Sequence, residues 1–149
     1  MKALTTHILD DILHRSTVTK NSYVGTFPAC MIPKSNKAKY SFITNSESHE
    51  KPGEHWNAWV VNGNRAIFFD SFGRPPLNVS KEYRHFLDKF DIHWVTSRVQ
   101  AFGSPACGYY CIHFIYLLSL GFEVKDFLDE YSNDYLKNDK TVYNIVNTL

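Results

Sequence analysis

Residues 55–73 read HWNAWVVNGNRAIFFDSFG, two apolar, aromatic-rich runs on either side of an Asn-Gly pair. Asn62-Gly63 between such runs is typical of a tight turn joining two antiparallel strands, because these residues tolerate the positive backbone angles of the turn. Both runs are apolar at successive positions, which indicates strands that are buried on both faces. We therefore predict a β-hairpin over residues 55–71 that lies inside the fold, with other elements covering each side.

Helices and short strands are predicted around this hairpin. Apolar residues from Leu4 to Leu13 recur at helical spacing and predict an amphipathic helix over residues 5–15. The segment 16–38 is interrupted by a glycine, prolines and a lysine-rich run, and we expect it to be mostly loop. The other expected elements, in chain order, are a strand at 40–44, a helix capped by Ser80, a strand at 92–99, a long buried helix at 106–120 and two shorter helices near 124–131 and 140–147. The pattern predicts an α+β domain in which a central mixed sheet packs its hairpin against the helix 106–120.

The composition indicates one packed domain spanning residues 1–149, since 44% of the residues are hydrophobic and 15% are aromatic. A net charge of +1 argues against duplex nucleic acid or an anionic membrane as the dominant partner. Three cysteines are an odd number, so at least one thiol is unpaired, which points to a reducing compartment. The N-terminus has no secretory signal, and the longest apolar stretch, 107–122, is shorter than the roughly 20 residues of a membrane span. We expect a soluble, intracellular monomer with no membrane segment.

The hairpin places a histidine beside a carboxylate. A two-residue loop at Asn62-Gly63 puts His55 directly opposite Asp70, and a loop one residue later puts Asp70 opposite Asn57, one diagonal step from His55. In both registers the two side chains share a face, with Cβ atoms roughly 5–8 Å apart. A three-residue loop would put them on opposite faces. With an even loop, Asp70 can orient the His55 imidazole as a general base.

Cys107 is the candidate nucleophile that would complete this set. It lies in the first turn of the helix 106–120, where unpaired backbone N–H groups and the helix dipole favour a thiolate. Gly108 would leave room for a substrate to approach the sulfur. Gln100 lies seven residues before Cys107, and its side-chain amide can donate to a developing oxyanion together with the Cys107 backbone N–H.

Five motifs stand in a fixed order along the chain. They are Tyr23-Val24-Gly25-Thr26-Phe27-Pro28, His55-Trp56, Asp70-Ser71-Phe72-Gly73, Gln100 and Pro105-Ala106-Cys107-Gly108-Tyr109-Tyr110-Cys111. In this order they resemble the adenovirus-type maturation protease, a relative of the SUMO-deconjugating, Ulp-like cysteine proteases. The resemblance covers about residues 20–120 and implies a papain-like, Ulp-like cysteine protease fold.

The resemblance also implies residue roles and a substrate. Cys107 would be the nucleophile, His55 the general base, Asp70 the orienting carboxylate and Gln100 the oxyanion donor. Trp56 would line one side of the substrate cleft, although its place in an apolar strand is equally compatible with a core residue. The substrates would be viral capsid or core precursor proteins, cleaved after small residues, often glycine, during virion maturation. The enzyme would then act in the virion and in the infected host cell, in the cytoplasm or nucleus. For this chain we expect no cofactor and no metal.

This sequence departs from the adenovirus pattern in three respects. The family's activating peptide forms a disulfide to a cysteine eleven residues before the glutamine, and Lys89 occupies that position here. We therefore expect no disulfide-linked activating peptide. The adenovirus-type enzyme also uses DNA as a cofactor, and the net charge of +1 gives no particular support for DNA binding by this chain. The chain also lacks much of the region after the nucleophile helix and resembles a compact form, as in a small DNA virus, a virophage or a related mobile element.

Two other functions are compatible with the sequence. The same chemistry could act on a SUMO- or ubiquitin-like conjugate instead of a capsid precursor. A non-enzymatic zinc module could use Cys107, Cys111 and His113, with Cys30 as a fourth ligand, although Cys-x3-Cys-x-His lacks the paired short loops of structural zinc sites.

Overall fold

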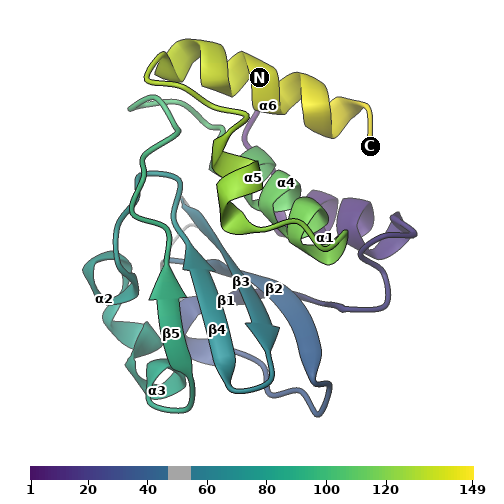
Figure 1. The fold of residues 1–149 in the computed structure, drawn as a ribbon, viewed down its shortest axis with the longest axis vertical. Helices are drawn as coiled ribbons and strands as arrows, with labels where there is room; N and C mark the ends of the chain where they lie inside the picture. The colour runs from purple at the N-terminus through teal and green to yellow at the C-terminus, as the bar shows by residue number, and fades with distance from the viewer. Residues whose placement is uncertain (47–54) are drawn as a thin grey trace.

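The computed structural model describes residues 1–46 and 55–149 as a five-stranded mixed sheet with helices on both faces (Figure 1). In spatial order the strands are β1 (Tyr23–Pro28), β2 (Lys39–Asn45), β3 (Trp56–Asn62), β4 (Arg65–Phe69) and β5 (Asp91–Trp94). The helices are α1 (Thr6–Arg15), α2 (Pro76–Val79), α3 (Arg84–Leu87), α4 (Cys107–Ser119), α5 (Val124–Leu128) and α6 (Tyr135–Asn147). The α+β fold class predicted from the sequence is confirmed.

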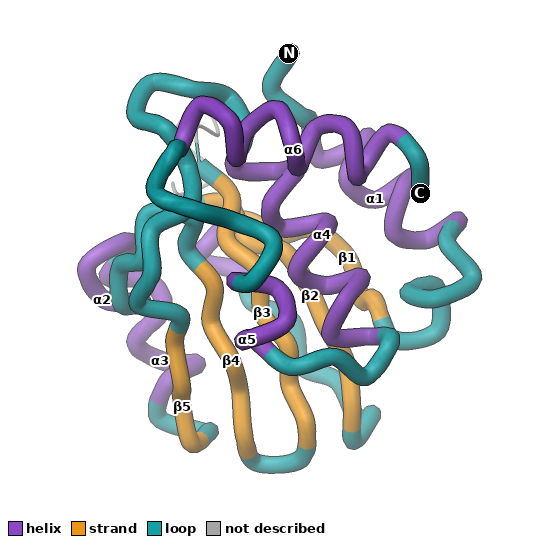
Figure 2. The backbone as a smooth tube through the Cα atoms, turned by 45° about the horizontal axis from the view of Figure 1, so that its top comes forward, coloured by secondary structure: helices purple, strands orange, loops and turns teal. Residues whose placement is uncertain are grey.

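The predicted hairpin forms the centre of the sheet. Strand β3 runs antiparallel to both of its neighbours, β2 and β4. Strands β1 and β5 lie at the two edges of the sheet (Figure 2), where β1 pairs in parallel with β2 and β5 pairs in parallel with β4. Asn62 pairs with Arg65, so the turn is Gly63-Asn64, the second of the two even loops that the sequence allows. Gly63 has φ +62°, a conformation that glycine adopts without a steric penalty. The even loop keeps the side chains of His55 and Asp70 on one face of the sheet.

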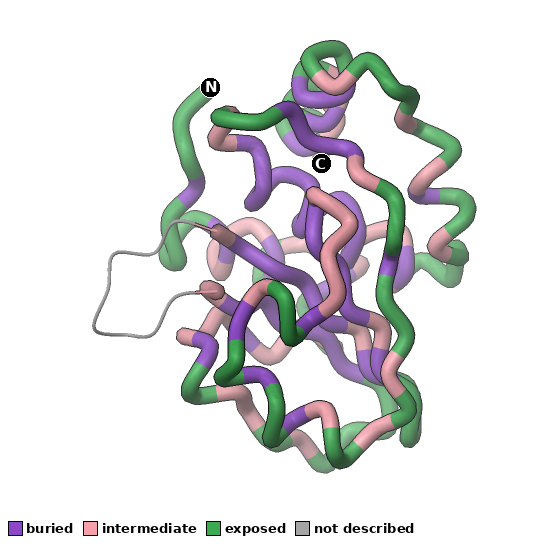
Figure 3. Tube along the Cα trace, turned by 90° about the vertical axis from the view of Figure 1, so that its left-hand side faces the viewer, coloured by how far each residue is buried: buried purple, intermediate pink, exposed green. Residues whose placement is uncertain are grey.

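Most residues of β3 and β4 are buried, as the two apolar runs indicate. Figure 3 shows the buried stretches of the chain gathered in the interior of the molecule. On one face, Ala58 and Phe69 belong to a core shared with residues of α1, α4, α5 and α6, and Phe69 contacts the rings of Phe114 and Phe127. On the other face, Trp59 and Phe68 form an aromatic cluster with Tyr83 and Phe86 from the α2–α3 region. Two cores therefore fix the hairpin from opposite sides. This packing also holds in place the ends of β3 and β4, which carry His55 and Asp70.

Three expected elements have different boundaries. Residues 23–28 form β1 instead of loop, because parallel pairing with β2 stabilises an edge strand that local signals do not reveal, with a register irregularity between Tyr23 and Thr26. The strand expected at 92–99 ends at Trp94, and the chain continues extended with isolated bonds such as Val99 N to Ser71 O, 2.9 Å. The last helix begins at Tyr135 rather than near 140, since Asp134 caps it by accepting from the Lys137 N–H.

Among the helices of residues 1–46 and 55–149, none combines the length and the apolar character that a membrane crossing requires.

We expect Trp59→Ala to lower the free energy of unfolding by about 3–5 kcal/mol. Trp59 is completely buried, stacks on Phe42 at 5.8 Å between ring centroids, and donates its indole N–H to Thr44 Oγ1 at 2.9 Å. Leu136→Ala is the control, because this α6 side chain is 71% exposed and its loss should change stability by less than about 0.5 kcal/mol. Urea unfolding followed by fluorescence and circular dichroism measures both, and equal effects would contradict the two-core description.

Candidate active site

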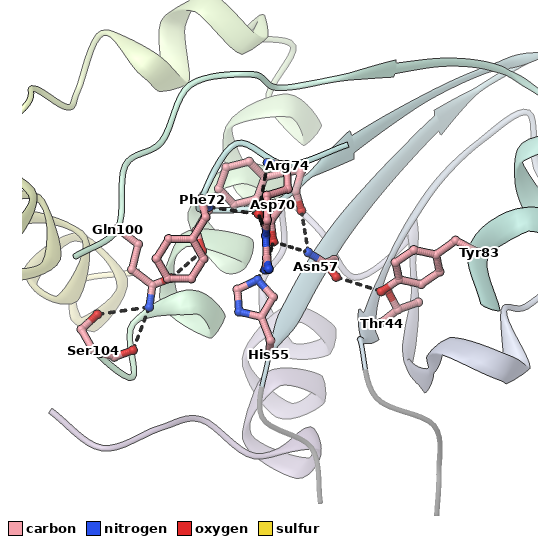
Figure 4. A network of polar contacts seen from close by, with 11 residues as sticks. Thr44, His55, Asn57, Asp70, Phe72, Arg74, Tyr83, Gln100 and Ser104 are labelled. Atoms are coloured by element: carbon pink, nitrogen blue, oxygen red, sulfur yellow. Dashed lines mark hydrogen bonds and ion pairs between the residues drawn. The ribbon is translucent and has the colours of Figure 1, made fainter. Parts of the chain in front are cut away.

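The structure brings His55 and Asp70 into direct contact (Figure 4). His55 stands immediately before β3 and Asp70 immediately after β4, so the two antiparallel strands deliver both side chains to one end of the sheet. The distance between His55 Nε2 and Asp70 Oδ1 is 2.5 Å. The pairing that strand parity predicted is therefore present in the folded chain.

Asp70 is completely buried and is surrounded by donors. Asn57 Nδ2 donates to Oδ1 at 2.9 Å, and the Arg74 guanidinium donates to both oxygens, at 3.0 Å from Nε and 3.2 Å from Nη2. The backbone N–H groups of Phe72 and Arg74 donate to Oδ2. Burial alone would raise the pKa of this carboxyl, but the hydrogen bonds and positive charges of His55 and Arg74 hold the pKa well below its usual range. Asp70 is therefore an anion at neutral pH and well into the acidic range.

Asn57 is itself held in one orientation. The hydroxyl of Tyr83 donates to Asn57 Oδ1 at 2.8 Å, and Thr44 Oγ1 lies 2.8 Å from the same hydroxyl. Because Asn57 Oδ1 accepts from Tyr83, the amide nitrogen must face Asp70. A polar chain thus crosses the sheet from the aromatic core to the carboxylate (Figure 4).

His55 is positioned between a carboxylate and a thiol. Burial lowers the pKa of the imidazole, but hydrogen bonds with Asp70 and Cys107, together with the negative charges of both partners, outweigh burial and raise the pKa to about 9. Since Nε2 contacts Asp70, Nδ1 is the ring nitrogen left to interact with the Cys107 thiol. At neutral pH the ring is therefore an imidazolium, the form in which it can donate a proton to a leaving group.

Cys107 is the first residue of α4, as the sequence predicted, and it is only 6% exposed. Within the described residues, no side chain caps this helix N-terminus. The backbone dipoles of the first turn therefore point toward the sulfur without a competing side-chain acceptor.

The space beside Gly108 is occupied by this chain itself. A Cβ at Gly108 would lie 3.1 Å from Leu4 Cβ and 3.3 Å from Trp56 Cδ1. Trp56 is buried and donates its indole N–H to Leu4 O at 3.0 Å, and the Tyr109 hydroxyl donates to Lys2 O at 3.1 Å. The expected opening for substrate at Gly108 is thus filled by the N-terminal segment, and Trp56 holds that segment against α4.

Gln100 is buried, and both ends of its amide are fixed. The Ser71 hydroxyl donates to Gln100 Oε1, and Gln100 Nε2 donates to the backbone oxygen of Ser104 at 2.8 Å and to Ser104 Oγ at 3.1 Å. The amide N–H groups therefore point into the loop that leads to Cys107 (Figure 4). Ser71 directly follows Asp70, so one short segment orients both the carboxylate and the glutamine.

Two residues of α6 clamp the backbone on either side of Gln100. Asn138 Nδ2 donates to Val99 O at 3.0 Å, and Asp139 Oδ1 lies 3.5 Å from the Ala101 N–H. The Tyr110 hydroxyl, from α4, donates to the same Asp139 oxygen at 2.7 Å. The clamp therefore ties the glutamine segment to the helix that carries Cys107.

Sequence reasoning missed Arg74, Asn138 and Asp139 as parts of the site, and it assigned no role to Ser71 and Phe72 although both belong to the motif at Asp70. Arg74 follows Asp70 by four residues. This spacing brings the two side chains into contact only because the loop between them turns back, with Gly73 at φ +75°. Phe72 stacks on the His55 ring with 5.5 Å between centroids. Nothing near Asn138 and Asp139 in the sequence indicates that they belong to the site, because these two residues of α6 (the α6 pair) contact Val99 and Ala101, almost forty positions away.

The structure does not assemble the alternative zinc site. Cys111 is completely buried, and burial raises the pKa of its thiol well above the usual value. His113 Nδ1 lies 2.6 Å from the Tyr131 hydroxyl, and burial lowers the pKa of this imidazole to about 4. Among the described residues, which include all three cysteines, no group of three or more potential ligands could hold a metal ion.

We expect Asp70→Asn to lower the pKa of His55 from about 9 to its ordinary value of 6.5 or below, because burial of the ring remains while the carboxylate charge is lost. A histidine-ring NMR titration measures this shift, and the ring signals of the exposed His93 serve as an internal control. The protonated ring stabilises the fold fully below pH 6.5, and this contribution disappears as pH rises through about 9. The difference in unfolding free energy between wild type and Asp70→Asn should therefore shrink by up to about 3 kcal/mol over that range. A pH-independent difference would contradict the charge state assigned to the pair.

No protein-family model matches the chain, and no curated protein matches its sequence. Solved structures do match its fold. The ASFV pS273R protease superposes with a TM-score of 0.60 at 15% identity, over 95% of this chain and 66% of that one, and its selenomethionine form gives 0.59 at 17%, over 95% and 67%. ChlaDub1 from Chlamydia trachomatis superposes with a TM-score of 0.50 at 18% identity, over 74% of this chain and 58% of that one. The chain thus spans about two thirds of the length of the first protease, and its fold is similar to the folds of these solved structures.

Proposed function

We propose that this chain is a cysteine endopeptidase. Cys107 is the nucleophile, His55 the general base and acid, Asp70 the orienting carboxylate and Gln100 the oxyanion donor. The observation that carries the proposal is a single imidazole held between a buried, ionised carboxylate and a thiol at the start of a helix. The protease fold and the order of the motifs along the chain support the same assignment.

The reaction follows from these positions. The Cys107 thiolate attacks the peptide carbonyl carbon, forming a C–S bond while the carbonyl π electrons move to oxygen. The Cys107 backbone N–H and one N–H of Gln100, released from Ser104 Oγ, donate to that oxyanion. As the tetrahedral intermediate collapses, His55 Nδ1 gives its proton to the leaving amine, and the C–N bond breaks to leave a thioester. Neutral His55 then takes a proton from water, whose oxygen attacks the thioester carbon. The C–S bond breaks, its electrons return to sulfur, and the carboxylic acid leaves while the Cys107 thiolate and the His55 imidazolium are restored.

Viral capsid or core precursor proteins are the substrates that we propose, cleaved after small residues such as glycine. The ordered motifs and the fold shared with a protease of ASFV support a viral setting, in the virion and the infected cell. Lys89 stands where the adenovirus-type enzymes place the cysteine of their activating disulfide, so we propose that activation needs no such linkage. In the proposed mechanism, four side chains and the Cys107 backbone N–H of this chain supply the catalytic groups.

Mass spectrometry after digestion of a proteome-derived peptide library tests the activity on many candidate sequences at once. New termini that follow glycine or another small residue support the proposed specificity. Ubiquitin and SUMO carrying a fluorogenic amide at the C-terminus form a parallel assay. Turnover of these probes with no cleavage in the library would favour the deconjugating alternative over capsid maturation.

We expect Cys107→Ala and His55→Ala to lower kcat/KM on a library-derived peptide by at least about 10³-fold. Cys107→Ala removes the nucleophile, and His55→Ala leaves an unassisted thiol that is mostly protonated at neutral pH. Cys30→Ala is the matched control, because Cys30 is an exposed cysteine in the short turn after β1 and has no role in the proposed mechanism. Comparable turnover in Cys107→Ala and in Cys30→Ala would refute the nucleophile assignment.

Gln100→Ala should lower kcat by roughly 10²-fold with little change in KM, because the amide acts on an oxyanion that exists only in the transition state. Steady-state kinetics on the same peptide separate the two constants. Gln100→Glu tests the donor role directly, since it keeps the size of the side chain and replaces the N–H donors by an acceptor. An unaltered kcat in both variants would exclude Gln100 from the oxyanion site.

A further inference from the structure

Phe102 is a large aromatic side chain exposed beside the candidate active site. It lies in the loop between Gln100 and Cys107, and 75% of its surface is accessible. Large apolar side chains at such an exposed position gain nothing from the core, and beside a reactive centre they often mark a binding surface. Exposure alone does not show that Phe102 binds a substrate, so we consider which groups contact its ring.

The Phe102 ring is connected to the His55 imidazole by stacking. Phe72 stacks on His55 with 5.5 Å between centroids and an interplanar angle of 25°. Phe102 in turn stacks on Phe72 with 5.5 Å between centroids and an angle of 19°. A nearly parallel series of three rings therefore runs from the imidazole to solvent. We call Phe72 and Phe102 the aromatic platform.

A guanidinium group holds the exposed end of the platform in place. Arg98 Cζ lies 3.6 Å from the centroid of the Phe102 ring and 3.9 Å from that of Tyr135, so the cation sits between two rings. Arg98 Nε also donates to Gln100 O at 2.8 Å. Phe102 is thus exposed and yet fixed, which lowers the entropy cost of binding against it.

The proton transfer determines which part of a peptide passes the platform. His55 must protonate the leaving amine, so the residue after the scissile bond has to lie against the imidazole. The oxyanion faces Gln100, and the acyl part of the substrate continues on the other side of the sulfur. The platform begins at the imidazole and therefore borders the path of the leaving chain.

We propose that Phe102, together with Phe72, forms a subsite for a bulky apolar side chain of the substrate on the C-terminal side of the scissile bond. This inference rests on the proposed endopeptidase function. Two guanidinium groups border the platform, Arg98 over Phe102 and Arg74 with its Cζ 5.5 Å from the Phe72 centroid. The subsite consequently disfavours lysine and arginine in the same position of the substrate.

The test compares peptides that differ only in the first residue after the scissile bond. Wild type should cleave the phenylalanine or leucine peptide with a higher kcat/KM than the glycine or lysine peptide. Phe102→Ala should lower the phenylalanine-to-glycine ratio of kcat/KM by about 10-fold, the effect of losing an apolar contact in a pocket. Phe102→Tyr, which keeps the ring, should retain most of the preference.

Phe122→Ala is the matched control, because Phe122 is a half-exposed phenylalanine in the loop after α4 and belongs to no part of the proposed site. It should keep the wild-type ratio. An equal loss on all four peptides in Phe102→Ala would overturn the subsite and indicate a merely structural role. An unchanged ratio, or a preference that moves only with residues before the scissile bond, would also overturn it.

A binding measurement separates this inference from the activity itself. In Cys107→Ala, which cannot turn over, the phenylalanine peptide should bind more tightly than the glycine peptide and shift the NMR signals of the Phe102 ring. Preferential binding without any cleavage by wild type would overturn the proposed function but retain the surface. Cleavage by wild type with no Phe102 shift on binding would retain the function and refute the subsite.

Discussion

The buried charge of Asp70 is the constraint on which the rest of the site depends. An ionised carboxylate removed from water costs several kcal/mol unless donors replace its hydration. Here side-chain donors from His55, Asn57 and Arg74 and two backbone N–H groups surround its oxygens. Each hydrogen bond to a charged group contributes about 1.5–3 kcal/mol, so the set offsets the desolvation. The same donors fix the carboxylate in space, and the imidazole takes its orientation from it.

Much of this geometry could be predicted from sequence because its causes are local. The Asn-Gly turn and the two apolar runs specify the hairpin, and strand parity then places His55 and Asp70 on one face whichever even loop forms. The position of Cys107 at the start of a helix follows from the loop residues before it and the apolar run after it. None of these features depends on a contact between distant segments.

The unpredicted parts depend on contacts between distant segments. Strand β1 exists because β2 pairs with it in parallel, and no periodicity within 23–28 indicates that partner. The amide of Asn57 is oriented by Tyr83, twenty-six residues later, and Asp139 reaches the backbone of Ala101 across thirty-eight. A single sequence contains no signal that specifies such pairs, since each depends on how the helices dock on the sheet.

The site is assembled from two structural units that differ in how they are held. The hairpin ends carry His55 and Asp70 and are fixed by cores on both faces of the sheet. Gln100 and Phe102 lie on an extended segment and loop with few ladder bonds, fixed instead by Ser71, the α6 pair and Arg98. Oxyanion stabilisation and side-chain selection therefore depend on tertiary contacts that can change without disturbing the hairpin. For this reason substitutions in α6 or at Arg98 should alter rate or specificity while leaving the charge state of the His55–Asp70 pair intact.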